Sequence, residues 1–146
     1  MYRRDYILRL IERFGRILIA LRSRILRREV DSAELRVQIR EMAEHAGLDL
    51  DIARQLDPAS LLLWLAPTPD IEEGRLWLMA ELLYLEALQA RSSTAGAGRT
   101  DLERALAIYS RLPPEWRPSA DFASAGERAT EVRSLLDAQA SCDSEA

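Results

Sequence analysis

The sequence predicts an all-α fold built from antiparallel helical hairpins, and three observations support this class. Valine and threonine, which favour strands, number only three and four among the 146 residues. In several segments, apolar residues recur every three or four positions, as they do along one face of a helix. No segment alternates apolar and polar residues for long enough to indicate a strand.

The first helix is predicted from about Arg3 to Arg28. Large apolar residues repeat there at alternating spacings of four and three, which places them along one helix face. Further leucines and isoleucines widen the apolar arc to roughly 200°, so more than one protein neighbour should cover this helix. The repeated residues form an interaction seam that consists of Ile7, Ile11, Phe14, Leu18, Leu21 and Ile25.

A second helix is predicted near residues 32–46, antiparallel to the first. Asp31 and Glu34 have the spacing of a variant capping box at its start. Gly47 follows its end, where a residue in the left-handed conformation commonly terminates a helix. Leu48 is then placed to pack back onto the last helical turn.

Two short helices and one long helix should follow. Asp49 is placed as the N-cap of the first short helix, and Asp57 as the N-cap of the second. Pro58 then occupies the first helical position, where its missing N–H costs nothing. The long leucine-rich helix is predicted from an N-cap at Asp70 to about Ser92, and its apolar residues cover so much of its circumference that it should be central.

A capping box formed by Thr100 and Glu103 predicts the next helix, which should end near Leu112. The last helix is expected somewhere between residues 121 and 138.

The length of the chain fits one domain with a sizeable core. We therefore expect a single helical domain over residues 1–139 and a disordered C-terminal tail over residues 140–146.

The stretch "AELLYLEALQA…DLERALAIYSRLPPEWRP" resembles a tetratricopeptide hairpin. Such repeats place small residues where two helices cross, and here Ala87 and Ala105 stand at matching positions. Tyr109 stands one turn beyond Ala105, where the repeat has an aromatic residue. An ordinary helical hairpin with alanine contacts is the alternative, because a repeat architecture needs several copies.

A second resemblance covers most of the chain. The opening, the segment after the second helix and the later leucine-rich hairpin resemble an uncharacterised family of small all-helical bacterial proteins, which start close to M-x-x-x-D-Y-I-x-R-x-I-E. The resemblance implies a helical fold and tetratricopeptide-like hairpins, and it implies no activity. The matching residues at the start are Asp5, Tyr6, Ile7, Arg9, Ile11 and Glu12.

Charge is unevenly distributed along the chain, whose basic residues are all arginine. Residues 1–28 carry a balance of +7, and residues 29–146 carry −11. Arg9, Arg13 and Arg16 share the polar face of the first helix and are candidates for binding an anionic surface, because arginine suits phosphate. The acidic remainder of the chain is the competing partner for these arginines.

The residue types exclude most catalytic and metal chemistry. A histidine-based metal cage or hydrolytic triad would depend on His45 alone, and Cys142 has no second cysteine to pair with. Glu81 and Glu86, or Glu72 and Glu73, could be interpreted as paired carboxylates for acid–base work, but charge of this density usually marks a solvated helix face. We therefore expect no catalytic residues, no cofactor and no metal.

These observations favour a small helical interaction or scaffold module that self-associates as a homo-oligomer with no catalytic activity. The alternative is binding to an anionic surface through the arginine-rich first helix. Nucleic acid is disfavoured, since neither a helix-turn-helix nor an aromatic stacking platform is evident. A membrane surface remains open but is not favoured. We recognise neither a signal peptide nor a bilayer-spanning segment, so a cytoplasmic location is expected.

Overall fold

The computed structural model describes residues 2–69 and 72–145, with side chains described within 6–69 and 72–138. Across these residues the chain is all-helical, as the sequence predicts, and no strand is present. The helices are α1 (Tyr2–Leu26), α2 (Ser32–His45), α3 (Leu50–Gln55), α4 (Pro58–Leu65), α5 (Glu73–Ser93), α6 (Arg99–Arg111) and α7 (Ala125–Glu145).

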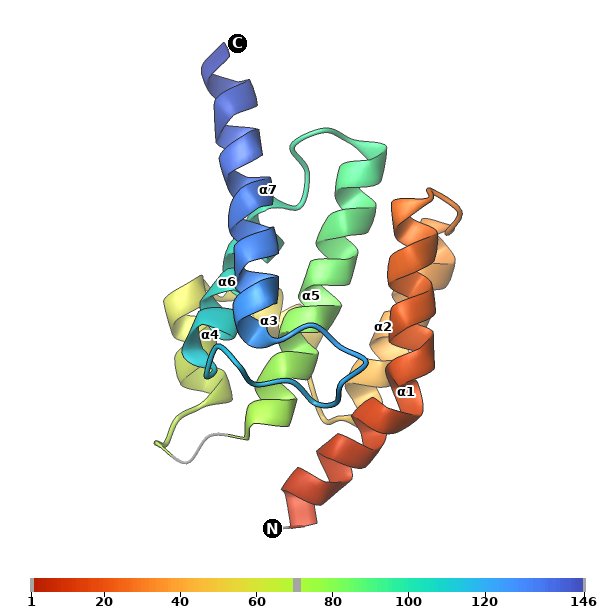
Figure 1. Ribbon diagram of the computed structural model, residues 1–146, viewed down its shortest axis with the longest axis vertical. Coiled ribbons are helices and arrows are strands. Elements are labelled where there is room, and N and C mark those ends of the chain that lie inside the picture. The colour runs from red at the N-terminus through yellow and green to blue at the C-terminus, as the bar shows by residue number, and fades with distance from the viewer. Residues whose placement is uncertain (1, 70–71, 146) are drawn as a thin grey trace.

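Helix α5 lies at the centre of the molecule, with α1 and α2 on one side and α6 on the other (Figure 1). Helix α7 packs on α6, and the short α4 packs on α6 as well. Neighbouring long helices alternate in direction from α5 to α7, as in an antiparallel array (Figure 1). The central place of α5 follows from its sequence, because its leucines face every direction and nearly all of them are buried.

The predicted end of α2 is confirmed in detail. Gly47 has a φ of +69°. The N–H of Leu48 donates to the carbonyl of Ala43 at 2.8 Å, and the N–H of Gly47 donates to the carbonyl of Glu44 at 3.1 Å. This pair of bonds is the Schellman arrangement, and the side chain of Leu48 is buried beneath it.

The caps of the two short helices also lie where the sequence places them. The Asp49 carboxylate accepts a hydrogen bond from the N–H of Ile52 at 3.1 Å, and the Asp57 carboxylate accepts one from the N–H of Ser60 at 2.7 Å. Pro58 is the first residue of α4. Hydrogen bonding by the side chain of Ser60, and then by its backbone N–H, lowers the pKa of Asp57.

Both predicted capping boxes are wrong. Asp31 is the N-cap of α2 but makes no side-chain cap bond, and Glu34 pairs instead with Arg24 of α1 at 3.3 Å. Helix α6 begins at Arg99, one residue before Thr100, and its N-cap is Gly98.

The position of Gly98 explains the start of α6. Its φ is +79°, and a Cβ built there would lie 2.9 Å from both the Cα and the carbonyl oxygen of Ala87. The chain therefore turns in close contact with the backbone of α5, where only glycine fits without a shift. Glu103 pairs with Arg99 at 3.0 Å rather than with the start of the helix.

Three other helix boundaries differ from the predicted ones. Helix α1 ends at Leu26, before Arg28, which has a left-handed φ of 58°. Helix α5 begins at Glu73, and the predicted N-cap Asp70 lies outside the described residues. Helix α7 begins at Ala125, within the predicted range, and the Ser124 hydroxyl accepts a hydrogen bond from the N–H of Glu127 at its start. It continues to residue 145, into the segment predicted as a disordered tail.

Candidate functional site

The six seam residues of α1 lie in the core of the chain itself. Each of their side chains is almost completely buried, and the main contact of α1 is with α5. The two helices approach closely at Gly74, where an added Cβ would lie 3.1 Å from Cγ2 of Ile7. Because the seam is covered within one chain, another molecule can meet α1 only on its flanks and its polar face.

A groove runs along one flank of α1. Leu8 is 42% exposed and Ile19 is 45% exposed, although both are large apolar residues. Between them lie the charged side chains of Glu12 and Arg16, also exposed. The groove has a volume of about 530 Å³, within the size range of ligand pockets. It is lined by Leu8, Ile11, Glu12, Gly15, Arg16, Ile19, Pro118, Ser119, Asp121 and Phe122.

Residues 113–124 form the other wall of this groove. They leave the end of α6, cross toward α1 and return to the start of α7 (Figure 1). The buried Phe122 anchors the segment, with its ring edge-to-face on Trp77 of α5 at 4.9 Å between centroids. A Cβ on Gly15 would lie only 3.1 Å from that ring, so the glycine lets the segment pack against α1. Two hydrogen bonds of 2.8 Å, from the Ala125 N–H to the Trp116 carbonyl and from the Gly126 N–H to the Pro114 carbonyl, fix the end of the segment.

The three candidate arginines lie on the exposed side of α1. Arg9, Arg13 and Arg16 are all exposed, and no ion pair joins them to another residue whose side chain is described. The Arg13 guanidinium lies 5.9 Å from the centroid of the Phe14 ring. In contrast, Arg22 forms an ion pair with Glu131 of α7 at 2.9 Å. The acidic part of the chain therefore neutralises some arginines of α1 but not the predicted cluster.

A buried network of charged residues connects α1, α5 and α7. Glu81 accepts a hydrogen bond from Nε of Arg128 at 2.9 Å, and both side chains are nearly inaccessible. Arg128 also pairs with Glu131 at 2.9 Å, and Glu131 in turn pairs with Arg22. The Tyr84 ring lies beside both guanidiniums, 5.2 Å from that of Arg22 and 5.9 Å from that of Arg128.

Burial controls the protonation of this network. It raises the pKa of Glu81, against the opposing positive charge of Arg128, so the cost of burying the carboxylate is only partly compensated. Burial acts to lower the pKa of Arg128, but Glu81, Tyr109 and Glu131 outweigh it and the net direction is upward. The guanidinium therefore stays protonated. Burial, followed by the charge of Glu81, raises the pKa of Tyr109 well above its usual value.

The sequence interpretation of Glu81 as part of a solvated helix face is therefore wrong. The signal was present, since Glu81 lies within "LMAELLYLEAL", where apolar residues surround it on every side of the helix. Arg22 is a comparable case, because it falls within the apolar arc of α1, and a charged residue at such a position indicates partial burial with a partner. A small cavity of about 230 Å³ adjoins the network and is lined in part by Arg22, Glu81 and Arg128.

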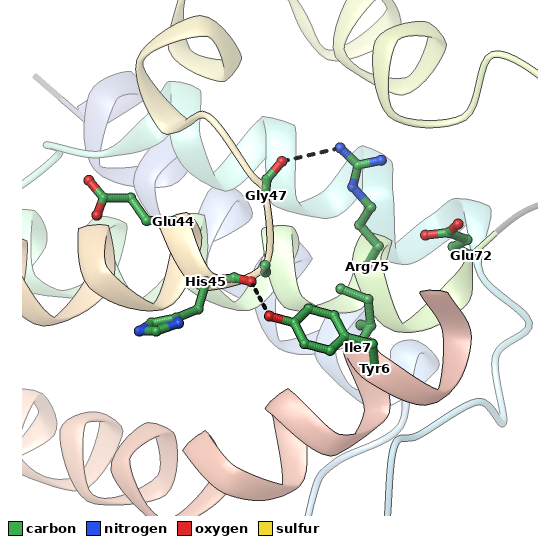
Figure 2. A pocket seen from close by; sticks show the side chains of 8 residues that line it. Tyr6, Ile7, Glu44, His45, Gly47, Glu72 and Arg75 are labelled. Atoms are coloured by element: carbon green, nitrogen blue, oxygen red, sulfur yellow. Dashed lines mark hydrogen bonds between the residues drawn. The ribbon is translucent and has the colours of Figure 1, made fainter. Parts of the chain in front are cut away.

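The pocket in Figure 2 lies where α1, the end of α2 and the start of α5 meet. It has a volume of about 400 Å³. The Tyr6 hydroxyl donates to the His45 carbonyl at 3.1 Å, and the Arg75 guanidinium donates to the Gly47 carbonyl at 3.4 Å (Figure 2). Both bonds satisfy carbonyls at the C-terminal end of α2, where a positive charge is favourable.

These two hydrogen bonds stabilise the end of α2. The imidazole of His45 points away from the Tyr6 hydroxyl (Figure 2) and is exposed, with its ring centroid 5.7 Å from that of Phe14. Glu44 and Glu72 lie on opposite sides of the pocket (Figure 2). Within residues 6–69 and 72–138, no group of three potential ligands from histidine, cysteine, aspartate and glutamate lies together.

The hairpin residues predicted from the tetratricopeptide resemblance are all buried between helices. Ala87 and Ala105 are fully inaccessible, and Ala87 contacts Gly98 at the turn between α5 and α6. The Tyr109 ring packs edge-to-face on Tyr84 of α5, with 6.4 Å between centroids. The two helices form a hairpin with extensive contacts. Its tetratricopeptide-like character stays a prediction.

No family model, curated protein or solved structure matches this sequence. The resemblance to the family of small helical bacterial proteins therefore stays a prediction. Among the described helices, none is both long and apolar enough to cross a bilayer.

Proposed function

We propose that this chain is a small helical interaction module that self-associates through the exposed flank of α1 and has no catalytic activity. The observation that supports it is the placement of Leu8 and Ile19. Both are large apolar residues left about half exposed beside a groove, although the seam next to them is fully covered. Burying such residues against protein removes apolar surface from water, which favours association. A cytoplasmic location is part of this proposal.

Light scattering coupled to size-exclusion chromatography tests the proposal. The wild type should show a mass above that of the monomer, with the associated fraction rising with concentration. Leu8→Ser combined with Ile19→Ser should shift the protein to monomer with its far-ultraviolet dichroism unchanged. Val37→Ser is the matched control, because Val37 is an exposed apolar residue of α2 that does not line the groove, and it should leave the mass unchanged.

A specific observation also supports the alternative of binding to an anionic surface. Arg9, Arg13 and Arg16 are exposed and have no acidic partner among the described side chains, while Leu8 and Ile19 lie beside them. This combination suits a helix lying on anionic lipid. Vesicles of anionic lipid, titrated at low salt, separate the two functions. A monomeric wild type whose vesicle binding is lost in Arg9→Ala with Arg13→Ala would replace the first proposal with this one.

A further inference from the structure

We infer that the partner of the α1 flank is the same flank of a second copy, with the two α1 helices antiparallel about a two-fold axis and Glu12 of each copy opposite Arg16 of the other. This inference rests on the proposed function and gives it a partner and a register. Two-fold contacts between identical surfaces are the commonest form of self-association.

Four exposed residues define the flank. Leu8, Glu12, Arg16 and Ile19 all line the groove and are all accessible. At about 100° per residue they share one side of the helix, and at about 1.5 Å per residue they extend over roughly 16 Å. The flank therefore presents apolar, acidic, basic and apolar side chains in that order along α1.

This order is self-complementary only when the two helices are antiparallel. Reversing the order gives apolar, basic, acidic and apolar, so each Glu12 meets an Arg16 and each Leu8 lies next to an Ile19. A parallel pair in register would instead place Glu12 against Glu12 and Arg16 against Arg16. Like charges in contact disfavour that arrangement, so the charge pattern selects the antiparallel one.

Both charged residues are available for this pairing. No ion pair joins Glu12 or Arg16 to any other residue within the described side chains, whereas Arg22 and Arg24 of the same helix are paired with Glu131 and Glu34. The two Glu12–Arg16 pairs would lie on either side of the symmetry axis. These two pairs would lie between the two apolar contacts of Leu8 with Ile19 and would set the register of the two α1 helices.

The groove provides space for the second helix. Phe122 and Pro118 are apolar parts of the wall that residues 113–124 contribute to this groove. In an antiparallel pair, Ile19 of the second copy lies beside Leu8, at the mouth of this groove. Each copy contributes one such contact, so the assembly closes as a dimer with both grooves occupied.

Charge reversal tests the register, with dimer dissociation constants measured by sedimentation at low salt. Glu12→Arg and Arg16→Glu should each weaken self-association about tenfold, because each replaces two attractive contacts by repulsive ones. The double variant Glu12→Arg with Arg16→Glu should restore the wild-type affinity. An equimolar mixture of the two single variants should form a heterodimer, in which every arginine again faces a glutamate.

Arg13→Glu is the control for Arg16→Glu, since it makes the same charge change on α1 at a residue that does not line the groove. It should leave the dissociation constant within about twofold of the wild type. A dimer that is weakened by Leu8→Ser with Ile19→Ser but indifferent to both charge reversals would overturn the antiparallel register and leave the proposed function standing. Failure of the double variant to recover affinity would overturn the register as well. A wild type that is monomeric at every concentration would overturn both.

Discussion

The Nε atom of Arg128 lies 2.9 Å from Oε1 of Glu81, and the two side chains are among the few charged groups that the described fold buries. They come from α7 and α5, which make few other direct contacts, since α7 packs mainly on α6. The pair therefore fixes how α7 sits against the centre of the molecule. Arg128 has a second partner in Glu131, whereas no other ion pair joins Glu81 to a described residue.

This asymmetry predicts unequal costs for the two single substitutions. Arg128→Met leaves a buried carboxylate without its cation and should lower the free energy of unfolding by about 3–5 kcal/mol. Glu81→Met should lower the free energy of unfolding by less, because Arg128 still has its ion pair with Glu131. Replacing both by methionine should recover most of the loss, since a buried ion pair often contributes little beyond an apolar pair of similar volume. Urea denaturation of the wild type, the two single variants and the double variant measures these free energies. A double variant as unstable as Arg128→Met would contradict the prediction.

Tyr109 should make the fold sensitive to alkaline pH. Burial and the charge of Glu81 raise its pKa well above the ordinary value of 10.0. The folded state therefore holds the proton more tightly than the unfolded state. The resulting stability is fully present below about pH 10 and is lost as the pH rises toward the folded pKa.

Tyr109→Phe should flatten this dependence above about pH 10, as measured by the free energy of unfolding in urea. No lysine titrates in this window, because all twenty Lys and Arg residues of the chain are arginine. Burial also raises the pKa of Tyr84, so the free energy of unfolding of the variant should still fall with pH, with a smaller slope. Identical slopes in the two proteins would contradict the role assigned to Tyr109.

Two glycines with similar backbone conformations should respond differently to alanine. Gly47 has a φ of +69° with nothing within 4 Å of an added Cβ, so Gly47→Ala should cost only the strain of that conformation, about 1–2 kcal/mol. Gly98 has a φ of +79°, and its added Cβ would also lie 2.9 Å from the backbone of Ala87. Gly98→Ala should therefore cost at least about 1 kcal/mol more, by overpacking. Thermal denaturation followed by dichroism compares them, and equal midpoints would argue against the close contact at Gly98.

Local rules predicted the parts of the fold in which a residue acts on its own neighbours in sequence. The caps at Asp49 and Asp57 and the helix end at Gly47 each depend on no more than six consecutive residues, and all three are confirmed. In both predicted capping boxes the glutamate pairs with an arginine and not with the start of the helix. Glu34 pairs with Arg24 of α1, and Glu103 pairs with Arg99. Neither arginine is visible in the capping-box spacing.

The candidate site was predictable only in part for the same reason. The alternating spacing of α1 identified its buried face, and its polar face was correctly placed toward solvent. The groove depends on residues 113–124, which have no helical period to predict their path. The buried network joins Glu81 to a residue 47 positions away, and such a pairing follows from how the helices pack rather than from any local pattern.

The hairpin between α5 and α6 should not tolerate a large side chain at Ala105. This residue is completely inaccessible and belongs to the helix that makes the most extensive contact with α5. Ala105→Phe adds a ring where the core has no space, which should lower the free energy of unfolding by about 1–3 kcal/mol. Ala33→Phe is the matched control, because Ala33 is an exposed alanine within α2, and it should change stability by less than about 0.5 kcal/mol. Urea denaturation of both variants measures the difference. If the Ala105 and Ala33 variants have the same midpoint, the two helices separate more easily at this crossing than their packing indicates.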